Sequence, residues 1–144
     1  MDWSKIDNTV EAFTLEGVKI PGKVVKVYDG DTVHIVFPVF GKMYKWNCRI
    51  SRIDTPELRT KNEKEKKYGY MVKDILLKRI LNKVVNVECG DFDKYGRLLV
   101  EINDGENISD WLISNKYAFA YDGGTKQNWE DYLDANMELL TLHD

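Results

Sequence analysis

The segment Cys48-Arg49-Ile50-Ser51-Arg52-Ile53-Asp54-Thr55-Pro56-Glu57 decides the fold, because it joins an alternating strand to an acidic turn. Apolar and polar side chains alternate over residues 44–51, so Arg49 is expected to point away from the core. Pro56 cannot donate a backbone hydrogen bond and keeps the preceding residue extended, so the strand ends there. The segment therefore supplies a guanidinium and two carboxylates, Asp54 and Glu57, beside one fixed turn. That combination suits a phosphate bound next to a hard metal ion.

Two further acidic segments stand at the ends of apolar runs. The turn Asp29-Gly30-Asp31-Thr32 joins the β-rich runs 24–28 and 33–37, which predicts a hairpin. The segment Asp93-Lys94-Tyr95-Gly96-Arg97 precedes the apolar run 98–100. Each motif is common by itself, but the three together, in this order, form a specific pattern.

These three motifs resemble those of the staphylococcal nuclease (thermonuclease) family, over residues 23–140. The order of predicted elements agrees with the fold that this resemblance implies. Residues 23–52 predict three antiparallel strands, residues 68–81 predict a helix, and residues 84–87 and 98–102 predict two more strands. Asn107 can cap a short helix, and residues 129–140 predict a last one. Five short strands interrupted by one helix are typical of a mainly β, α+β domain built on an OB-type barrel. We expect this domain to span residues 23–144.

The remaining segments predict less chemistry. Residues 1–22 are expected to be an extension packed on the domain, since the apolar positions of residues 3–13 favour a short amphipathic helix or arm. The apolar connection 37–42 is expected to be a long loop that folds back on the barrel. Cys48 and Cys89 are expected to be buried free thiols rather than a disulfide.

Composition limits the class of protein. A chain of 144 residues, 43% hydrophobic and 31% charged, predicts one globular domain with a real core. No apolar run is long enough to span a membrane, and no secretory signal is visible. We therefore expect an intracellular protein without membrane association, and a monomer.

The net charge of −3 hides a division between the two parts of the chain. Residues 1–90 carry 17 basic and 12 acidic side chains, a net of +5, and residues 91–144 carry 4 basic and 12 acidic ones, a net of −8. An ordinary solvated surface explains this as well as a nucleic-acid partner does. On the second interpretation, Lys64, Lys66 and Lys67 lie in a mobile loop, 58–67, that guides a polyanion to the site, with the last helix facing away.

The family resemblance implies a calcium site. Its ligands would be Asp31, Asp54 and the carbonyl of Thr55, with Glu57 close by through water and Asp29 behind them. Zinc is not expected, because His34 and His143 are the only histidines and no Cys/His ligand spacing exists.

The resemblance also implies roles in phosphodiester hydrolysis. Arg49 and Arg97 would stabilise charge on the phosphoryl oxygens, and Glu57 would activate or orient water. By the family pattern the 5′ oxygen leaves, which gives 3′-phosphate ends. Tyr95 and Tyr121 match tyrosines of the nucleotide pocket, and Phe119 stands where the bacterial enzyme has tyrosine.

Two functions remain open at this point. The first is a Ca²⁺-dependent nuclease acting on DNA and RNA. The second is a non-catalytic module that binds nucleic acid or protein. The first is favoured, because a binding module has no need to keep the complete set Asp31, Arg49, Asp54, Thr55, Glu57 and Arg97.

Overall fold

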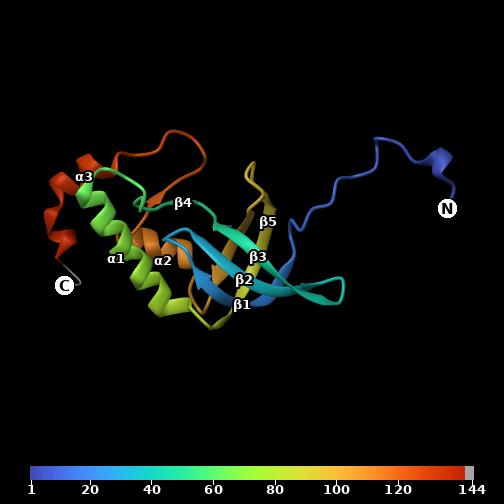
Figure 1. The fold of residues 1–144 in the computed structure, drawn as a ribbon, viewed down its shortest axis with the longest axis horizontal. Helices are drawn as coiled ribbons and strands as arrows, with labels where there is room; N and C mark the ends of the chain where they lie inside the picture. Colours follow the sequence, from blue (N-terminus) through green and yellow to red (C-terminus); the bar gives the residue numbers. More distant parts are fainter. Residues whose placement is uncertain (142–144) are drawn as a thin grey trace.

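Five strands with buried residues on their inner face form a closed barrel in the computed structural model (Figure 1). The structure describes residues 1–141. The barrel strands are β1 (Lys19–Val27), β2 (Thr32–Val39), β3 (Lys42–Ile50), β5 (Val84–Phe92) and β6 (Leu98–Asn103). Their spatial order is β1-β2-β3-β6-β5, and β5 pairs back onto β1. The pair β3–β6 is parallel, whereas the other pairs are antiparallel. The predicted OB-type, mainly β fold is confirmed.

Helices cover one side of this barrel, and the N-terminal arm leaves it on the opposite side (Figure 1). The helices are α1 (Glu63–Ile80), α2 (Ile108–Ser114) and α3 (Trp129–Ala135), with two short 3₁₀ turns, η1 (Trp3–Lys5) and η2 (Met137–Leu140). An asparagine caps each α-helix, because the side chains of Asn62, Asn107 and Asn128 accept a hydrogen bond from the backbone of the first turn. The predicted last helix is broken at Asn136, whose amide donates to the carbonyl of Tyr132.

Helix α1 begins at Glu63, earlier than the predicted start at residue 68. Its first turn is polar and capped by Asn62, so the apolar periodicity of the sequence did not include it. Lys64, Lys66 and Lys67 therefore belong to a helix, and the prediction of a mobile loop over these residues is wrong. Helix α3 also packs against α1, and Lys64 forms an ion pair with Asp134. The expectation that the last helix faces away from these lysines is wrong, because α3 contacts α1 and Asp134 pairs with Lys64.

The connection between β2 and β3 is a two-residue turn and not a long loop. Phe40 and Gly41 both adopt left-handed backbone conformations, with φ of 53° and 75°, as a tight hairpin turn of the I′ type requires. Phe37 is a strand residue, buried and stacked on Trp46 with ring centroids 5.2 Å apart. Only the Phe40 ring is left outside, 88% exposed. Strand pairing therefore continues through the apolar run that the sequence suggested was a loop.

The N-terminal segment is an arm with one 3₁₀ turn rather than an amphipathic helix. Residues 1–14 are all exposed, and Leu15 is the first buried side chain. Among the apolar side chains, Phe13 contacts Phe40 at 5.9 Å between ring centroids. Strand β1 then begins at Lys19, within the segment 1–22.

Three smaller features complete the description. A short antiparallel pair, β4 (Ile53–Asp54) with β7 (Phe119–Ala120), was not predicted and lies beside the barrel. Cys48 and Cys89 are buried and free, as predicted. No helix within residues 1–141 is both long and apolar enough to cross a membrane. His143 and the end of the predicted domain lie outside the described residues.

Candidate active site

The first acidic element of the site is the turn between β1 and β2. The Asp29 carboxylate accepts hydrogen bonds from the backbone N–H of Asp31 at 3.0 Å and of Thr32 at 2.9 Å, so it shapes its own turn. The carbonyl of Asp31 accepts from the N–H of Ile50 at 2.8 Å, which ties the turn to the end of β3. The Asp-Gly-Asp-Thr sequence thus fixes the Asp31 carboxylate beside the strand that carries Arg49.

Two close backbone approaches hold this turn against the second acidic element. A Cβ at Gly30 would lie 2.9 Å from both Thr55 Cβ and a methyl of Val72, so only glycine lets the turn rest on Thr55 and α1. A Cβ at Gly69 would lie 3.0 Å from the carbonyls of Pro56 and Glu57. The two glycines therefore bring the acidic turn, the Thr-Pro-Glu segment and α1 into contact.

Asp54 is the buried carboxylate of the site, 3% exposed in strand β4. Trp129 donates its indole N–H to Asp54 Oδ2 at 3.2 Å, and Lys126 Nζ lies 3.4 Å from Oδ1. The Phe119 ring, opposite Asp54 in the β4–β7 pair, packs on Trp129 with centroids 4.0 Å apart. Phe119 therefore supports the residue that orients Asp54.

Glu57 is positioned through its backbone. Its N–H donates to the Glu65 carboxylate at 2.8 Å, so the first turn of α1 holds the chain at this point. Its side chain is about half exposed, and one oxygen lies 4.0 Å from Lys126 Nζ. A carboxylate that is fixed at its backbone and open to solvent can contact water near Asp54.

Burial and neighbouring negative charge raise the pKa values of three carboxylates of the site, Asp29, Asp54 and Glu57. Burial and the neighbouring charge of Asp31 raise the pKa of Asp29 to about 7. Burial also raises the pKa of Asp54 and of Glu57, an effect that Lys126 opposes and Asp31 reinforces. Four carboxylates therefore share one region that favours a positive charge, and the Lys126 ammonium lies at its edge.

Arg49 lies in β3 and Arg97 immediately precedes β6, the strand that pairs with β3. The Arg49 guanidinium donates to the carbonyls of Ile50 and, at 2.7 Å, of Ile53, and lies 3.5 Å from Asp31. Arg97 donates to Asp93 at 2.8 Å and approaches the Thr32 hydroxyl at 3.5 Å. Burial opposes ionisation of Asp93, but hydrogen bonds from the backbone of Arg97 and Tyr95 and from the guanidinium lower its pKa overall.

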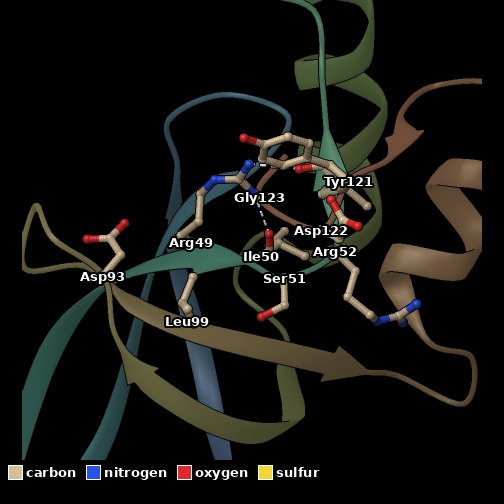
Figure 2. Close-up of a pocket in the computed structure, with 10 residues that line it drawn as sticks. Arg49, Ile50, Ser51, Arg52, Asp93, Leu99, Tyr121, Asp122 and Gly123 are labelled. Carbon is tan, nitrogen blue, oxygen red and sulfur yellow. Dashed lines mark hydrogen bonds between the residues drawn. The ribbon is translucent and has the colours of Figure 1, made fainter. Parts of the chain in front are cut away.

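A hollow of about 290 Å³ lies beside Arg49 and is called here the arginine hollow. Figure 2 shows the Arg49 side chain extending from β3 toward the Tyr121 ring, with Asp93 at the other end and Arg52 directed away. The lining comprises Arg49, Ile50, Ser51, Arg52, Ile53, Asp93, Leu99, Tyr121, Asp122 and Gly123. Tyr95 is exposed, and the Arg97 guanidinium lies 5.5 Å from the centre of its ring. Tyr95 and Tyr121 thus flank the arginines, whereas the Phe119 ring packs on Trp129 and Tyr132.

The donor set fits a hard divalent cation. Asp31, Asp54 and Glu57 present oxygen atoms, which Ca²⁺ prefers. Burial, with a smaller contribution from the charge of Asp31, raises the pKa values of Asp54 and Glu57, and a bound cation would favour their ionised forms. No group of three His, Cys, Asp or Glu side chains within residues 1–141 stands ready to hold a metal by itself. Backbone carbonyl and water oxygens would have to complete the coordination.

Sequence reasoning missed three contributors to this site: Lys126, Trp129 and Glu65. Lys126 lies in a segment without a motif, and Trp129 served only as a helical apolar position. Glu65 resembled one more charge in a lysine-rich stretch. Trp129 and Lys126 contact Asp54, which lies more than 70 residues away in the sequence. Glu65 contacts Glu57, eight residues away. No local sequence pattern therefore indicates these contacts.

Comparison with known proteins agrees with this geometry. The family model described as "Staphylococcal nuclease homologue" matches residues 47–138, more than half of the chain. The chain belongs to the staphylococcal nuclease homologue family. Within this family, Arg49, Asp54, Thr55, Glu57 and Arg97 fall inside the matched region, and the Asp29–Asp31 turn precedes it.

Three curated relatives are similar to this chain. An "Uncharacterized endonuclease" of Escherichia coli O157:H7 is 30% identical over 72% of this chain and 62% of its own length. "Endonuclease YhcR" of Bacillus subtilis is 33% identical over 77% of this chain and 10% of its own length. The "Thermonuclease" of Staphylococcus hyicus is 34% identical over 60% of this chain and 50% of its own length. The similarity thus spans less than two thirds of each relative.

Proposed function

We propose that this protein is a Ca²⁺-dependent phosphodiesterase that hydrolyses DNA and RNA and leaves 3′-phosphate ends. The observation that carries the proposal is the meeting of two arginines and a carboxylate cluster at the ends of β2, β3 and β6. The names of the E. coli, B. subtilis and S. hyicus relatives, endonuclease and thermonuclease, support hydrolysis of nucleic acid.

The residues divide the reaction among them. Arg49 and Arg97 bind phosphoryl oxygens and stabilise the charge that develops there, since a planar guanidinium matches two such oxygens. Glu57 holds a water molecule for attack on phosphorus, and the 5′ oxygen leaves. Tyr95 and Tyr121 stack on the nucleotide beside the arginines.

A calcium ion would be held by Asp31, Asp54 and the Thr55 carbonyl, with Asp29 supporting the turn and Glu57 nearby. When bound, it would supply a hard positive charge close to the phosphate oxygens. The flexible coordination that Ca²⁺ accepts suits two short carboxylates better than the strict octahedron of Mg²⁺ does.

Digestion of plasmid DNA and of RNA tests this proposal, with Ca²⁺, with Mg²⁺ and with a calcium-selective chelator. We expect cleavage of both nucleic acids with Ca²⁺, none with the chelator, and terminal 3′-phosphates on the products. Full activity in Mg²⁺ alone would refute the calcium assignment. Binding of nucleic acid without cleavage under every condition would indicate the non-catalytic module instead.

A further inference from the structure

A second hollow borders the carboxylate cluster, through Asp29 and Glu57. Its volume is about 560 Å³, and residues of β1, the acidic turn, the segment after β4 and α1 line it. We call it the basic hollow; its lining residues are Lys26, Tyr28, Asp29, Glu57, Leu58, Arg59, Tyr70 and Lys73. Asp29 and Glu57 belong also to the candidate active site, so the basic hollow adjoins it.

Three cations outnumber the two carboxylates in the lining of this hollow. Lys26, Arg59 and Lys73 line it, and none of them forms an ion pair with a carboxylate of residues 1–141. By contrast, Arg52, Arg79 and Arg97 are each held by acidic side chains. The acidic groups of the hollow, Asp29 and Glu57, belong to the candidate active site. The three cations are therefore suited to successive phosphates of a strand that reaches this site.

Two tyrosine rings are exposed in the same hollow. Tyr28 is 42% exposed at the end of β1, and Tyr70 is 52% exposed on the outer side of α1. Lys26 lies over the Tyr28 ring at 5.8 Å. Neither ring belongs to the buried core. Exposed aromatic rings between free cations are the combination that single-stranded nucleic acid recognises, by stacking bases while the cations follow the backbone.

The arginine hollow and the basic hollow are separate, and each includes residues of the candidate active site. The arginine hollow contains Arg49 and Tyr121, the basic hollow contains Glu57, and no residue lines both. Asp31, a neighbour of Asp29 in the acidic turn, lies 3.5 Å from Arg49. A strand whose phosphate contacts Arg49 and faces Glu57 would therefore have the basic hollow next to it, because Glu57 lines that hollow.

We propose that the basic hollow binds the single-stranded polynucleotide segment that continues past the cleaved phosphodiester, on the side away from Tyr121. This rests on the proposed function for the direction of the strand. Duplex DNA is not the expected occupant, because its bases are stacked on one another and cannot reach the rings of Tyr28 and Tyr70. The hollow thereby favours unpaired substrates over paired ones.

Fluorescence anisotropy in the presence of chelator measures this binding without cleavage. The probes are a labelled single-stranded octanucleotide and a labelled hairpin duplex. Replacing both rings, Tyr28→Leu with Tyr70→Leu, should weaken binding of the single strand about tenfold or more and leave that of the duplex within about twofold. Replacing two cations, Arg59→Gln with Lys73→Gln, should flatten the salt dependence for the single strand by about 1.4 log units per log unit of salt.

A matched control pair exists at the other end of β3. Lys42 lies over the Tyr44 ring at 5.6 Å, and Tyr44 is 43% exposed, nearly the geometry of Lys26 and Tyr28. Tyr44 is five residues along β3 from Arg49, or about 17 Å. The variant Lys42→Gln with Tyr44→Leu should therefore leave both affinities and the salt slope unchanged.

Each result decides the matter. Equal effects of the hollow and control variants would overturn the proposal, as would parent binding that is no tighter for the single strand than for the duplex. An equal loss of duplex affinity in the tyrosine variant would refute stacking. If the hollow variants lose binding while no metal supports cleavage, the basic hollow is correct and the proposed hydrolysis is wrong. If the protein cleaves but these variants bind normally, the hydrolysis stands and the hollow does not.

Discussion

Lys126 is expected to compete with the divalent cation for the carboxylate cluster. Its ammonium lies 3.4 Å from Asp54 and 4.0 Å from Glu57, so a positive charge already stands beside both groups. A divalent cation bound by Asp54 would be repelled by the Lys126 ammonium and must displace it. The change Lys126→Gln removes this charge but keeps a polar side chain of similar reach.

The size of the effect follows from the distance and the exposure. Coulomb's law gives about 1 kcal/mol for unit charges at such a distance in a water-like medium, and more in a drier one. Because the Lys126 side chain is 49% exposed, the lower value applies, and measured pairs of this kind contribute about 0.2–1 kcal/mol. The variant should therefore lose about 0.5–1 kcal/mol of unfolding free energy without metal. The same energy should tighten Ca²⁺ binding about two- to fivefold.

Calorimetric titration with Ca²⁺ and thermal unfolding with and without Ca²⁺ measure the two effects. Lys126→Arg should behave as the parent, since it keeps the charge. Lys78→Gln is the matched control for loss of an exposed ion pair, because Lys78 pairs with Asp74 on α1 at 2.8 Å, away from the cluster. If Lys126→Gln binds Ca²⁺ no more tightly than the parent, and Lys126→Arg gives the same affinity as Lys126→Gln, the reasoning is refuted.

Three further predictions concern the site and the core. Arg49→Ala and Arg97→Ala should each lower kcat about 10³-fold, by analogy with arginines that stabilise phosphoryl transfer, with a parent-like circular dichroism spectrum and melting curve. Without metal, the free energy of unfolding should fall as the pH rises from about 4 to about 7, because folded Asp29 keeps a proton that the unfolded chain releases. The variant Asp29→Asn, which retains the acceptor oxygen, should flatten this decline in thermal melts recorded at a series of pH values. Burial raises the pKa of Cys48 to about 12, so Ellman's reagent should modify neither it nor Cys89 near neutral pH until the protein is denatured.

The barrel could be predicted because its information is local. Alternation along 44–51, the Asp-Gly turn at 29–30 and the cap at Asn107 each act through neighbours in the chain, and each appears in the structure as expected. The hairpin turn at residues 40–41 was missed, because a phenylalanine with positive φ is uncommon, although Gly41 stands at the second turn position. The first turn of α1 was missed because it is stabilised by a cap and not by an apolar stripe.

The partners of the site residues could not be predicted, because they depend on packing between distant segments. Asp54 was identified from its motif, but its contacts with Trp129 and Lys126 exist only because α3 and the segment before it pack against β4. The backbone of Glu57 is likewise fixed by Glu65, after α1 has begun. Motifs indicated the candidate groups, whereas tertiary packing determines their charge environment.

The two arginines differ in how far neighbouring groups offset their positive charge. Arg97 is held by the carboxylate of Asp93, which offsets part of its charge while it fixes the guanidinium. Arg49 is held mainly by the neutral carbonyls of Ile50 and Ile53, and its closest carboxylate, Asp31, lies at 3.5 Å. Carbonyl acceptors orient a guanidinium without neutralising it, and a cation shared with Asp31 would weaken the remaining attraction. Arg49 therefore presents the greater uncompensated charge to a phosphate, whereas Arg97 is suited to orienting it.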